Sequence, residues 1–369
     1  MNVLLVFTYG YSLKTWEEGG VLSREISIYE ELSKKHNINF KFLTFGNEGD
    51  LEIQNKINFE VIPIYSFINK SKYKFINYLN SFFIPFRLKK EIGNNYDLIK
   101  QHQLLGSWIS IILKFSISVP LYIRTGYDMY TFSKEMKKPK LTQFLYFLLT
   151  KISIYFSNLY SVSSKADFDL LNKSSNNKNI VIRTNWVLQT KNKKFDNRYE
   201  NKILSVGRLE EQKNFSRLIE LLKNSRFELD IVGSGSKKNE LINLANKNNV
   251  KIKILDNLNN SELLSLMKKY KYFISTSLYE GNPKTIIEAM SCGCIVFASK
   301  IVNHSEIISH STNGFLFNVE SNELFELISN ISKYDQLNIS NNAIKHVDVN
   351  FSINKIAAIE KKDYVNLIV

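Results

Sequence analysis

The sequence is poor in the residues that could hold a small fold together covalently or through a metal ion. Only two of its 369 residues are cysteines, and Cys292 and Cys294 stand one residue apart, too close for an ordinary structural disulfide. No group of cysteines and histidines has the spacing of a zinc site. These absences exclude a disulfide scaffold, and we expect a chain that works in a reducing compartment without a structural metal ion.

A secretion signal and a long uninterrupted hydrophobic run are also lacking. Residues 1–7 have no basic segment and are typical of a buried first strand. The most apolar stretch, 141–160, contains Lys151, whose insertion at a membrane centre costs about 2.5–3.5 kcal/mol, so we expect a core helix there rather than a membrane span. The composition, 44% hydrophobic and 23% charged, excludes a mostly disordered chain.

Positive charge exceeds negative charge, and the excess is uneven. Lys and Arg number 49 against 35 Asp and Glu; residues 1–200 carry a net charge of +11, and residues 201–369 carry +3. The first half is therefore expected to meet the larger anionic partner, which could be a membrane surface, a nucleic acid or a phosphorylated substrate.

Short apolar runs alternate with helical periods along the chain, as in parallel sheets with crossover helices. The expected strands are 3–7, 98–99, 121–123 and 159–162 and, after a polar stretch at 189–201, 203–206, 229–232, 252–255, 272–275 and 295–298. We therefore predict an α/β chain of two doubly wound, Rossmann-like domains with a ligand cleft between them. Their expected bounds are 1–190 and 201–349, with a C-terminal helix at 350–369 that packs back towards the first domain.

Two groups of residues in the second half point to specific chemistry. In the first group a strand ends at Gly207, Arg208 and Lys213 follow in the loop, and a helix begins near Asn214, which is a good N-cap. Two cations at a strand end beside a helix N-terminus suit a diphosphate. Two solvated cations on an ordinary loop are the alternative.

The second group spans residues 280–290. A loop with Gly281 and Pro283 leads from a strand into a helix, whose free N–H groups could hold sugar hydroxyls or a phosphate. Glu280 lies on the loop and Glu288 two turns into the helix, and a carboxylate can accept two hydrogen bonds from a ribose diol. A surface role for Glu288 is the alternative, but its apolar neighbours predict a buried helix, in which a glutamate needs partners.

Together these motifs resemble the retaining nucleotide-sugar glycosyltransferases of family 4, within glycosyltransferase group 1. The resemblance rests on Gly-Arg-Leu…Gln-Lys-Asn at 207–214, Ile-Val-Gly-Ser-Gly at 231–235, Glu280 and Glu288 followed by Ala-Met-Ser-Cys-Gly, Glu-Ile-Ile at 306–308 and Asn-Gly at 313–314. It covers about residues 200–320 strongly and the first half weakly. It implies the GT-B fold and a hexosyltransferase of the EC 2.4 class that retains the anomeric configuration.

The resemblance also implies roles for individual residues. Arg208 and Lys213 would neutralise the donor diphosphate and, with Glu280 near the transferred sugar, form the catalytic set; Glu288 would hold the ribose. The donor-binding residues would be Arg208, Lys213, Gly233, Glu280, Gly281, Asn282, Pro283, Lys284, Thr285 and Glu288, together with Gly20. Gly20 belongs to a Gly-Gly sequence that resembles the turn before the first helix.

Acceptor-binding candidates lie in the first half. His102 and Asp128 follow expected strands, and Arg124 lies just before the turn at Gly126. Many relatives have a histidine before the glycine of this turn, where this chain has Thr125. The role of that histidine is therefore not transferred to this position, and Arg124 or Asp128 could serve instead.

The mechanism that the resemblance implies breaks the C1–O bond to the diphosphate through an oxocarbenium-like state. The two cations would stabilise the charge that develops on the diphosphate of a UDP- or GDP-sugar, so no metal ion or other cofactor is expected. No Asp-x-Asp pair stands at a predicted strand end. The alternatives are a nucleotide-sugar epimerase of the GT-B fold and a basic nucleic-acid-binding protein, in which Glu280 and Glu288 would have no role.

The stretch 65–90 is both basic and aromatic, with six cations, eight aromatic residues and no acidic residue. This composition suits an anionic membrane surface, and a core helix with a solvated basic rim is the alternative. We expect a cytoplasmic protein that is peripheral on the inner face of the plasma membrane and has no nucleic-acid partner. Its expected acceptor is a saccharide or a lipid-linked oligosaccharide of a bacterial cell-surface polysaccharide, such as lipopolysaccharide or capsule.

Overall fold

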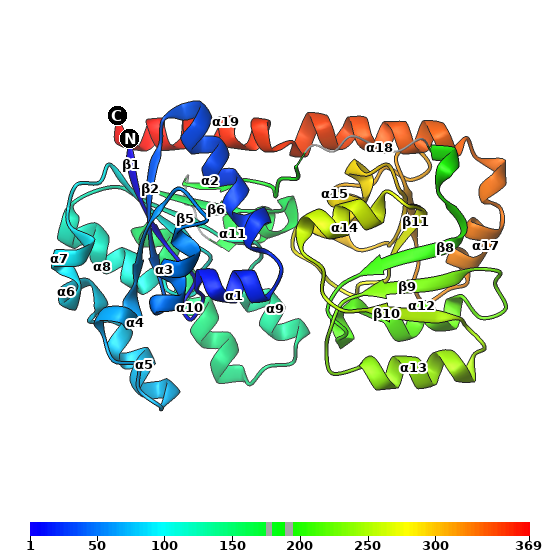
Figure 1. The fold of residues 1–369 in the computed structure, drawn as a ribbon, viewed down its shortest axis with the longest axis horizontal. Coiled ribbons are helices and arrows are strands. Elements are labelled where there is room, and N and C mark those ends of the chain that lie inside the picture. Colours follow the sequence, from blue (N-terminus) through cyan, green and yellow to red (C-terminus); the bar gives the residue numbers. More distant parts are fainter. Residues whose placement is uncertain (175–178, 189–194) are drawn as a thin grey trace. The chain divides into compact units, whose positions relative to one another are not determined.

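The computed structural model describes residues 1–174, 179–188 and 195–369, which fall into two compact units (Figure 1). Unit 1 comprises Met1–Thr184 together with Ile356–Val369, and unit 2 comprises Asn185–Lys355. Part of the polar stretch that we expected between the domains, 189–194, lies outside the described residues.

Unit 1 is built on a parallel sheet with the strand order β3-β2-β1-β4-β5-β6-β7. The order reverses between β1 and β4, which pair with each other, and ligands of such sheets bind beyond the carboxyl ends of the strands at this switch point. The strands are β1 (Asn2–Val6), β2 (Asn39–Thr44), β3 (Glu60–Pro63), β4 (Leu98–His102), β5 (Leu121–Arg124), β6 (Leu159–Val162) and β7 (Ile180–Ile182).

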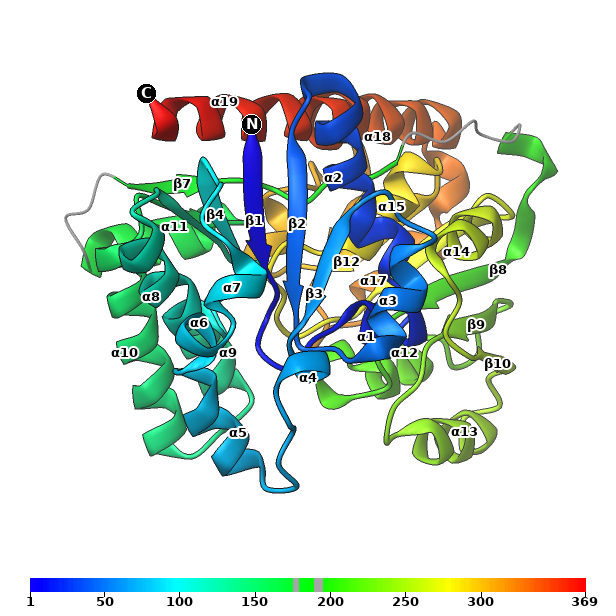
Figure 2. The same cartoon turned by 60° about the vertical axis from the view of Figure 1, so that its left-hand side comes forward.

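Helices connect these strands and cover the sheet, whose central strands are buried. They are α1 (Leu13–Glu18), α2 (Leu22–His36), α3 (Glu48–Gln54), α4 (Ile64–Phe67), α5 (Lys74–Ser81), α6 (Ile84–Arg87), α7 (Lys89–Ile92), α8 (Ser107–Ile117), α9 (Met129–Glu135), α10 (Lys140–Phe156) and α11 (Lys165–Ser174). The last helix, α19 (Ile353–Ile368), lies almost wholly in unit 1, next to β1 (Figure 2). Its Glu360 pairs with Lys100 of β4, and both side chains are buried.

Unit 2 is a second parallel sheet, in the order β10-β9-β8-β11-β12-β13. Its strands are β8 (Tyr199–Val206), β9 (Glu228–Val232), β10 (Ile252–Leu255), β11 (Tyr270–Ser275), β12 (Ile295–Ser299) and β13 (Phe315–Phe317). Its helices are α12 (Phe215–Leu221), α13 (Lys238–Lys247), α14 (Asn260–Met267), α15 (Lys284–Ser291), α16 (Val302–Ser305), α17 (Glu323–Ser329) and α18 (Gln336–Phe351), with 3₁₀ turns η1 (Phe195–Asn197), η2 (Glu211–Lys213) and η3 (Ile331–Lys333).

The predicted strands are all present, and the fold class is the predicted one of two doubly wound α/β units. Four strands were not predicted: β2, β3, β7 and β13. β7 and β13 have three residues each, too few for a pattern to be distinguished from a loop. The predicted helix over 350–369 has the wrong start, because Ser352 is extended and bridges to Val187, which separates α18 from α19.

Helix α10 corrects the expectation of a core helix at 141–160. Its buried residues are Gln143, Thr150, Ser153 and Ile154, most of them polar. Ile154, Leu149 and Phe156 contribute to the core. Most of its other large apolar residues are exposed: Leu141, Phe144, Leu145, Phe147, Leu148, Ile152 and Tyr155. The apolar face is thus the outer face. Among the described helices none is long and apolar enough to cross a membrane.

Candidate active site

The candidate site in unit 2 begins where two strand ends approach each other closely. Gly207 follows β8 and Gly233 follows β9. Gly233 has φ +156°, and a Cβ atom there would lie 1.9 Å from the carbonyl oxygen of Gly207. Only glycine allows this backbone approach. The Leu209 N–H donates to the Ser234 carbonyl at 2.9 Å, which holds the two loops together.

Lys213 and Glu280, which are 67 positions apart in the sequence, form an ion pair. The Lys213 side chain runs over Gly207, where a Cβ atom would lie 2.9 Å from Lys213 Cε. Burial raises the pKa of the Glu280 carboxyl, but the Lys213 ammonium and the Ser277 hydroxyl outweigh burial and hold this pKa below its ordinary value. Glu280 is therefore a carboxylate at neutral pH, and its charge is balanced by Lys213.

Gln212, to which the sequence analysis assigned no role, connects Arg208 to the loop that carries Glu280. Arg208 Nη2 donates to Gln212 Oε1 at 3.0 Å, and Gln212 Nε2 donates to the Tyr279 carbonyl at 2.9 Å. The Leu278 N–H donates to the Gln212 carbonyl at 2.9 Å. The structure thus brings the three predicted catalytic residues to one pair of loops. Gln212 could have been identified from the sequence by its place in the Gln-Lys-Asn motif, next to Lys213.

Asn214 does not act as the predicted N-cap of α12. Its φ is +51°, in the left-handed region, and its side chain makes no capping hydrogen bond. This backbone conformation turns the chain from η2 into α12. The turn is held instead by Thr276, whose hydroxyl lies 3.0 Å from the carbonyl oxygens of both Lys213 and Asn214.

The loop from Gly281 to Thr285, predicted to bracket the sugar and phosphate, contacts the segment that enters unit 2. The Asn185 N–H donates to Asn282 Oδ1 at 3.1 Å, and Asn185 Nδ2 donates to the Asn282 carbonyl at 2.8 Å. Lys284 Nζ lies 4.8 Å from the centroid of the Trp186 ring. Pro283 occupies the N-cap position of α15. The loop is thus ordered by its own chain, and its contacts with a donor stay a prediction.

Glu288 is buried in α15, as its apolar neighbours predicted. Its Oε1 accepts a hydrogen bond from Asn260 Nδ2 at 2.7 Å, and Asn260 is the first residue of α14. Glu288 is the fifth residue of α15, so it lies a little over one turn into the helix, not two as expected. Asn260 was not indicated by the sequence and orients this carboxylate.

A polar layer beside Glu280 was also not anticipated. His304 of α16 is fully buried, its Nδ1 lies 2.8 Å from the Ser299 carbonyl oxygen, and Ser299 Oγ donates to the Ser277 carbonyl at 2.6 Å. Burial lowers the pKa of His304 to about 4, although the nearby Glu280 carboxylate opposes this shift. The imidazole is therefore neutral at neutral pH. His304 could have been noticed in the sequence by its position between a predicted strand and the Glu-Ile-Ile motif at 306–308.

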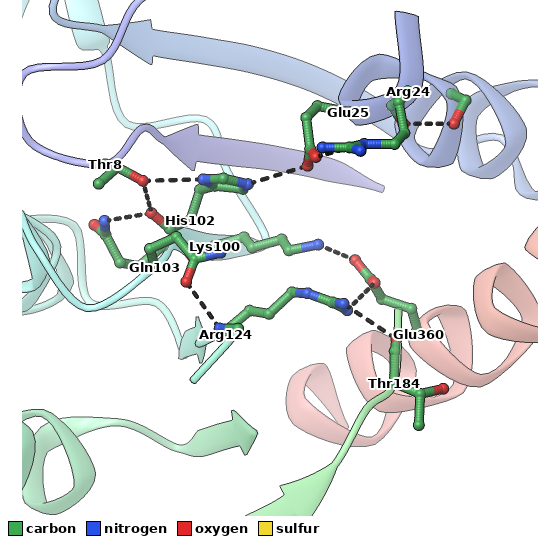
Figure 3. Close-up of polar contacts among 12 residues, drawn as sticks. Thr8, Arg24, Glu25, Lys100, His102, Gln103, Arg124, Thr184 and Glu360 are labelled. Atoms are coloured by element: carbon green, nitrogen blue, oxygen red, sulfur yellow. Dashed lines mark hydrogen bonds and ion pairs between the residues drawn. The ribbon is translucent and has the colours of Figure 1, made fainter. Parts of the chain in front are cut away.

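In unit 1 the predicted acceptor residue His102 is held at the end of β4 (Figure 3). Thr8 Oγ1 donates to the His102 carbonyl at 2.6 Å and lies 3.0 Å from His102 Nδ1. Because the Thr8 proton is used on the carbonyl, Thr8 Oγ1 accepts from Nδ1–H. His102 Nε2 lies 3.6 Å from Glu25 Oε2, and the Trp16 ring meets the imidazole edge-on.

Arg124 and Asp128 have structural partners within unit 1. Arg124 Nη2 donates to the Thr184 carbonyl at 3.1 Å, and Nη1 lies 3.9 Å from Glu360 Oε2 (Figure 3). Asp128 caps α9, because its Oδ2 accepts from the Thr131 N–H at 2.8 Å and from the Thr131 hydroxyl at 2.7 Å. Both side chains therefore already have partners within the protein, and their roles in binding the acceptor stay predictions.

The Gly-Gly turn is placed differently from the expectation. It lies between α1 and α2, and therefore precedes the second helix. Gly20 has φ +69°, a conformation that favours glycine, and its N–H donates to the Glu17 carbonyl at 2.9 Å. Its contact with a donor phosphate stays a prediction.

Comparisons with known proteins place this site in a family. Residues 188–346 match the family model described as glycosyl transferases group 1, and this segment contains Arg208, Lys213, Glu280, Glu288 and His304. The capsular polysaccharide biosynthesis glycosyltransferase CapH of Staphylococcus aureus is 30% identical over 252 residues, which cover 63% of this chain and 68% of that protein. The chain belongs to the group 1 glycosyltransferases. Its activity is therefore sugar transfer, in the EC 2.4 class.

This group 1 glycosyltransferase is also similar to one protein over a shorter segment and to one solved structure at lower identity. The N-acetylgalactosamine-N,N'-diacetylbacillosaminyl-diphospho-undecaprenol 4-alpha-N-acetylgalactosaminyltransferase of Campylobacter jejuni is 30% identical over 139 residues, 37% of this chain and 38% of that one. Among solved structures, Anabaena HepE in complex with UDP superposes with a TM-score of 0.77 at 17% identity, over the full length of both chains. This likeness confirms the predicted GT-B fold, whereas the narrower assignment to family 4 stays a prediction.

Proposed function

We propose that this enzyme is a retaining hexosyltransferase that moves a sugar from a UDP- or GDP-sugar to a saccharide acceptor in cell-surface polysaccharide synthesis. The observation that carries the proposal is the meeting of Arg208, Lys213 and Glu280 at the strand ends of unit 2. The name of CapH, which refers to capsular polysaccharide, and the UDP complex of HepE support the pathway and the donor.

The diphosphate of the donor binds between Arg208 and Lys213 in this proposal. Arg208 is exposed, and Gln212 orients its guanidinium, which suits bidentate contact with phosphate oxygens. Lys213 exchanges its pairing with Glu280 for the diphosphate, which offers a stronger negative charge. As the C1–O bond breaks, both cations stabilise the charge that develops on the leaving diphosphate, so that no metal ion is required for this step.

The two carboxylates hold the groups on either side of the diphosphate. Glu288 is oriented by Asn260 and accepts hydrogen bonds from the ribose hydroxyls. Glu280, once Lys213 has moved, accepts hydrogen bonds from the transferred sugar. Both side chains are mostly buried, and in such surroundings a hydrogen bond between a hydroxyl and a carboxylate is strong.

The acceptor contacts unit 1 in this proposal, with His102 as the first candidate. The contact with Thr8 fixes the orientation of the imidazole, and Nε2, which lies 3.6 Å from Glu25 Oε2, is the ring nitrogen that would meet a hydroxyl group of the acceptor. Arg124 and Asp128 are weaker candidates, because ion pairing and helix capping already account for them.

We also propose that unit 1 docks on an anionic membrane through α5 and α10, which presents the enzyme to a lipid-linked acceptor. Phe144 and Tyr155 of α10 are 57% and 75% exposed, and Phe75 of α5 is 69% exposed. Lysines flank these apolar side chains, at positions 70, 72 and 74 and at 134, 137, 138 and 140. Figures 1 and 2 show α5 and the connection from α9 to α10 projecting from the same end of unit 1.

This combination favours a lipid surface over a protein partner. Apolar side chains surrounded by lysines match the acyl boundary and the anionic headgroups of a bilayer, and each lysine near such a surface contributes about 1 kcal/mol. The Campylobacter relative is named for an acceptor that carries diphospho-undecaprenol, a lipid. Sedimentation with anionic vesicles, but not with neutral ones, is the expected result; equal binding to both, or to neither, would contradict the electrostatic part of the proposal.

A thermal-shift screen with UDP- and GDP-sugars, followed by a transfer assay with the stabilising donor, tests the proposed function. We expect one donor class to raise the melting temperature, and the anomeric configuration of the product, read by NMR, to match that of the donor. Turnover should persist in EDTA. Conversion of the donor to its epimer without any acceptor would favour the epimerase instead, and a chain that no nucleotide sugar stabilises would refute the proposal.

A further inference from the structure

We infer that His304 is a further donor-binding residue, whose Nε2 accepts a hydrogen bond from a hydroxyl group of the transferred sugar next to Glu280. The inference rests on the proposed function and adds to it a residue that determines which sugar is accepted. It follows from the hydrogen bonds of the polar layer at the ends of β11 and β12.

A short series of hydrogen bonds joins His304 to the segment that carries Glu280. His304 Nδ1 lies 2.8 Å from the Ser299 carbonyl, and Ser299 Oγ donates to the Ser277 carbonyl at 2.6 Å. Ser277 precedes Glu280 by three residues, and its hydroxyl helps to hold the pKa of the Glu280 carboxyl below its ordinary value. β11 and β12 are neighbouring parallel strands, with Ser275 opposite Ala298, so the residues that follow them lie at the same edge of the sheet.

The bonding of Nδ1 decides what Nε2 can do. A carbonyl oxygen only accepts, so Nδ1 carries the proton that it donates to Ser299, and Nε2 of the neutral ring is an acceptor. His304 is fully buried, and its Nε2 has no hydrogen-bond partner among the residues that the structure describes. A buried acceptor without a donor is unfavourable, so a donor from outside the protein is expected to complete it.

The chemistry of the neighbours identifies that donor group. Glu280 carries a negative charge, and His304 adds a second acceptor close to it, so a phosphate, which offers only acceptors at neutral pH, would be repelled. A sugar hydroxyl is an O–H donor and suits both groups. In the structure Lys213 covers Glu280 and fills the space over Gly207. Recruitment of Lys213 by the diphosphate would open this place to the sugar.

Two substitutions of His304 separate its structural bond from its proposed binding role. In His304→Asn the amide can reproduce the Nδ1 donor to Ser299, but nothing replaces Nε2. In His304→Gln the amide oxygen can reach the position of Nε2, but the bond to Ser299 is lost. Affinities for UDP, GDP, UDP-glucose, UDP-galactose, UDP-N-acetylglucosamine, UDP-N-acetylgalactosamine and GDP-mannose would be measured by calorimetry on wild type and both variants, with thermal unfolding as the folding control.

We expect His304→Asn to bind the preferred nucleotide sugar about tenfold more weakly than wild type, with its affinity for the matching nucleoside diphosphate unchanged, and His304→Gln to retain most of the sugar affinity. The reverse order, with Asn like wild type and Gln impaired, would show a purely structural histidine and overturn the inference. Equal losses for the sugar nucleotide and the diphosphate would overturn it as well, because they would indicate a general change of the site or a bound water.

Deoxyfluoro analogues of the preferred donor provide a second measurement that uses the wild-type fold. Fluorine cannot donate a hydrogen bond, so one analogue should bind wild type about tenfold more weakly than the parent sugar, and this difference should disappear in His304→Asn. A difference of the same size in wild type and variant would refute the role of His304 while leaving the proposed function intact. A wild-type protein that binds none of the nucleotide probes would refute both.

Discussion

Individual buried charges in the site are held by specific partners. The Glu280 side chain is 10% exposed and is balanced by Lys213, while Glu288 is oriented by the neutral amide of Asn260. Removal of one member of a buried pair leaves the other charge uncompensated, which costs more than the pair itself contributes. A substitution of one of these residues can therefore affect both catalysis and folding, and the two effects have to be measured separately.

Replacement of Lys213 by alanine is expected to lower turnover by at least about 100-fold, because the proposed mechanism uses this cation to stabilise the leaving diphosphate. The same is expected for Arg208→Ala. Steady-state kinetics with the identified donor measures the effect, and circular dichroism checks the fold. Lys237→Ala, which removes a lysine that pairs with Glu211 at the surface, is the matched control and should keep wild-type activity. Full activity in both site variants would remove these cations from the mechanism.

The depressed pKa of His304 predicts a pH dependence of stability. The unfolded histidine binds a proton below its ordinary pKa of 6.5, whereas the folded one does so only below about 4. Between these values the unfolded state binds more protons, so stability falls as the pH falls. We expect wild type to lose about 2 kcal/mol more than His304→Gln between pH 7 and pH 5. Urea unfolding at the two pH values measures this, and parallel losses in the two proteins would contradict it. Glu280, whose pKa is lowered, stabilises the fold above about pH 4.5, and this contribution is lost only as the pH falls below that value, outside the range of this measurement.

At the scale of elements, α10 shows why a helix of apolar residues need not be a core helix. Its polar residues Thr150 and Ser153 face the protein, where Ser153 Oγ lies 2.8 Å from Ser107 Oγ of α8. Seven of its aromatic and aliphatic side chains are exposed, whereas Ile154 is buried and Leu149 and Phe156 pack against the core. Apolar content alone does not distinguish these two orientations, because only the face that meets the neighbouring helix is fixed by packing. Contiguous exposed apolar side chains are a feature of docking surfaces, which is the role proposed for α10.

The double variant Phe144→Glu with Leu148→Glu should no longer sediment with anionic vesicles, because two exposed apolar side chains are replaced by negative charges that the anionic lipid repels. Both side chains are exposed, so stability should change by less than about 1 kcal/mol. The matched control places the same charges at Leu337 and Val349, exposed residues of α18 in unit 2, and should bind vesicles like wild type. Activity on a water-soluble acceptor should survive in both. Unchanged vesicle binding of the α10 variant would exclude α10 as the docking surface.

At the scale of the whole molecule, the end of the chain completes the first unit. Glu360 of α19 pairs with Lys100 of β4 and lies 3.9 Å from Arg124 of β5 (Figure 3). Tyr364 donates to the same carboxylate. A second contact joins Arg183 and Asp363 in a two-bond ion pair. Burial raises the pKa of Glu360, but the two cations outweigh burial and lower it overall. Segments far apart in the sequence therefore share one buried charge cluster.

Glu360→Gln is expected to destabilise unit 1 by about 3–5 kcal/mol, because Lys100 and Arg124 would stay buried without a counter-charge. The double variant Lys100→Met with Glu360→Leu should recover much of this loss, since it removes both charges of the pair. Glu17→Gln, at an exposed ion pair with Lys56, is the control and should cost less than about 1 kcal/mol. Urea unfolding measures all three, and a Glu360 variant as stable as the control would show that α19 does not depend on this pair.

Much of the architecture could be predicted from the sequence, because buried parallel strands appear in a sequence as short runs of apolar residues. The strand 159–162 was predicted at its observed bounds, and the strands before Gly207 and Gly233 at their observed ends. Predictions that depend on orientation were less successful. Asn214 was expected to cap a helix and adopts a left-handed turn instead, and the face of α10 that is buried was not foreseen.

The candidate donor-site residues could be proposed from the sequence because their order along two loops is local information: a cation pair after one strand, and a carboxylate pair around one helix start. Their contacts with a donor stay a prediction. By itself, the sequence determined the family, the alternation of strands and helices, and the residue types at the strand ends. Only the tertiary structure decided that Lys213 pairs with Glu280, that Gln212 and Asn260 orient the charged groups, and that a neutral His304 lies beside the carboxylate. The contacts of Lys213 with Glu280, of Gln212 with Tyr279 and of Asn260 with Glu288 join residues 28 to 67 positions apart. Burial and packing select such partners, and both arise only when the sheet has formed.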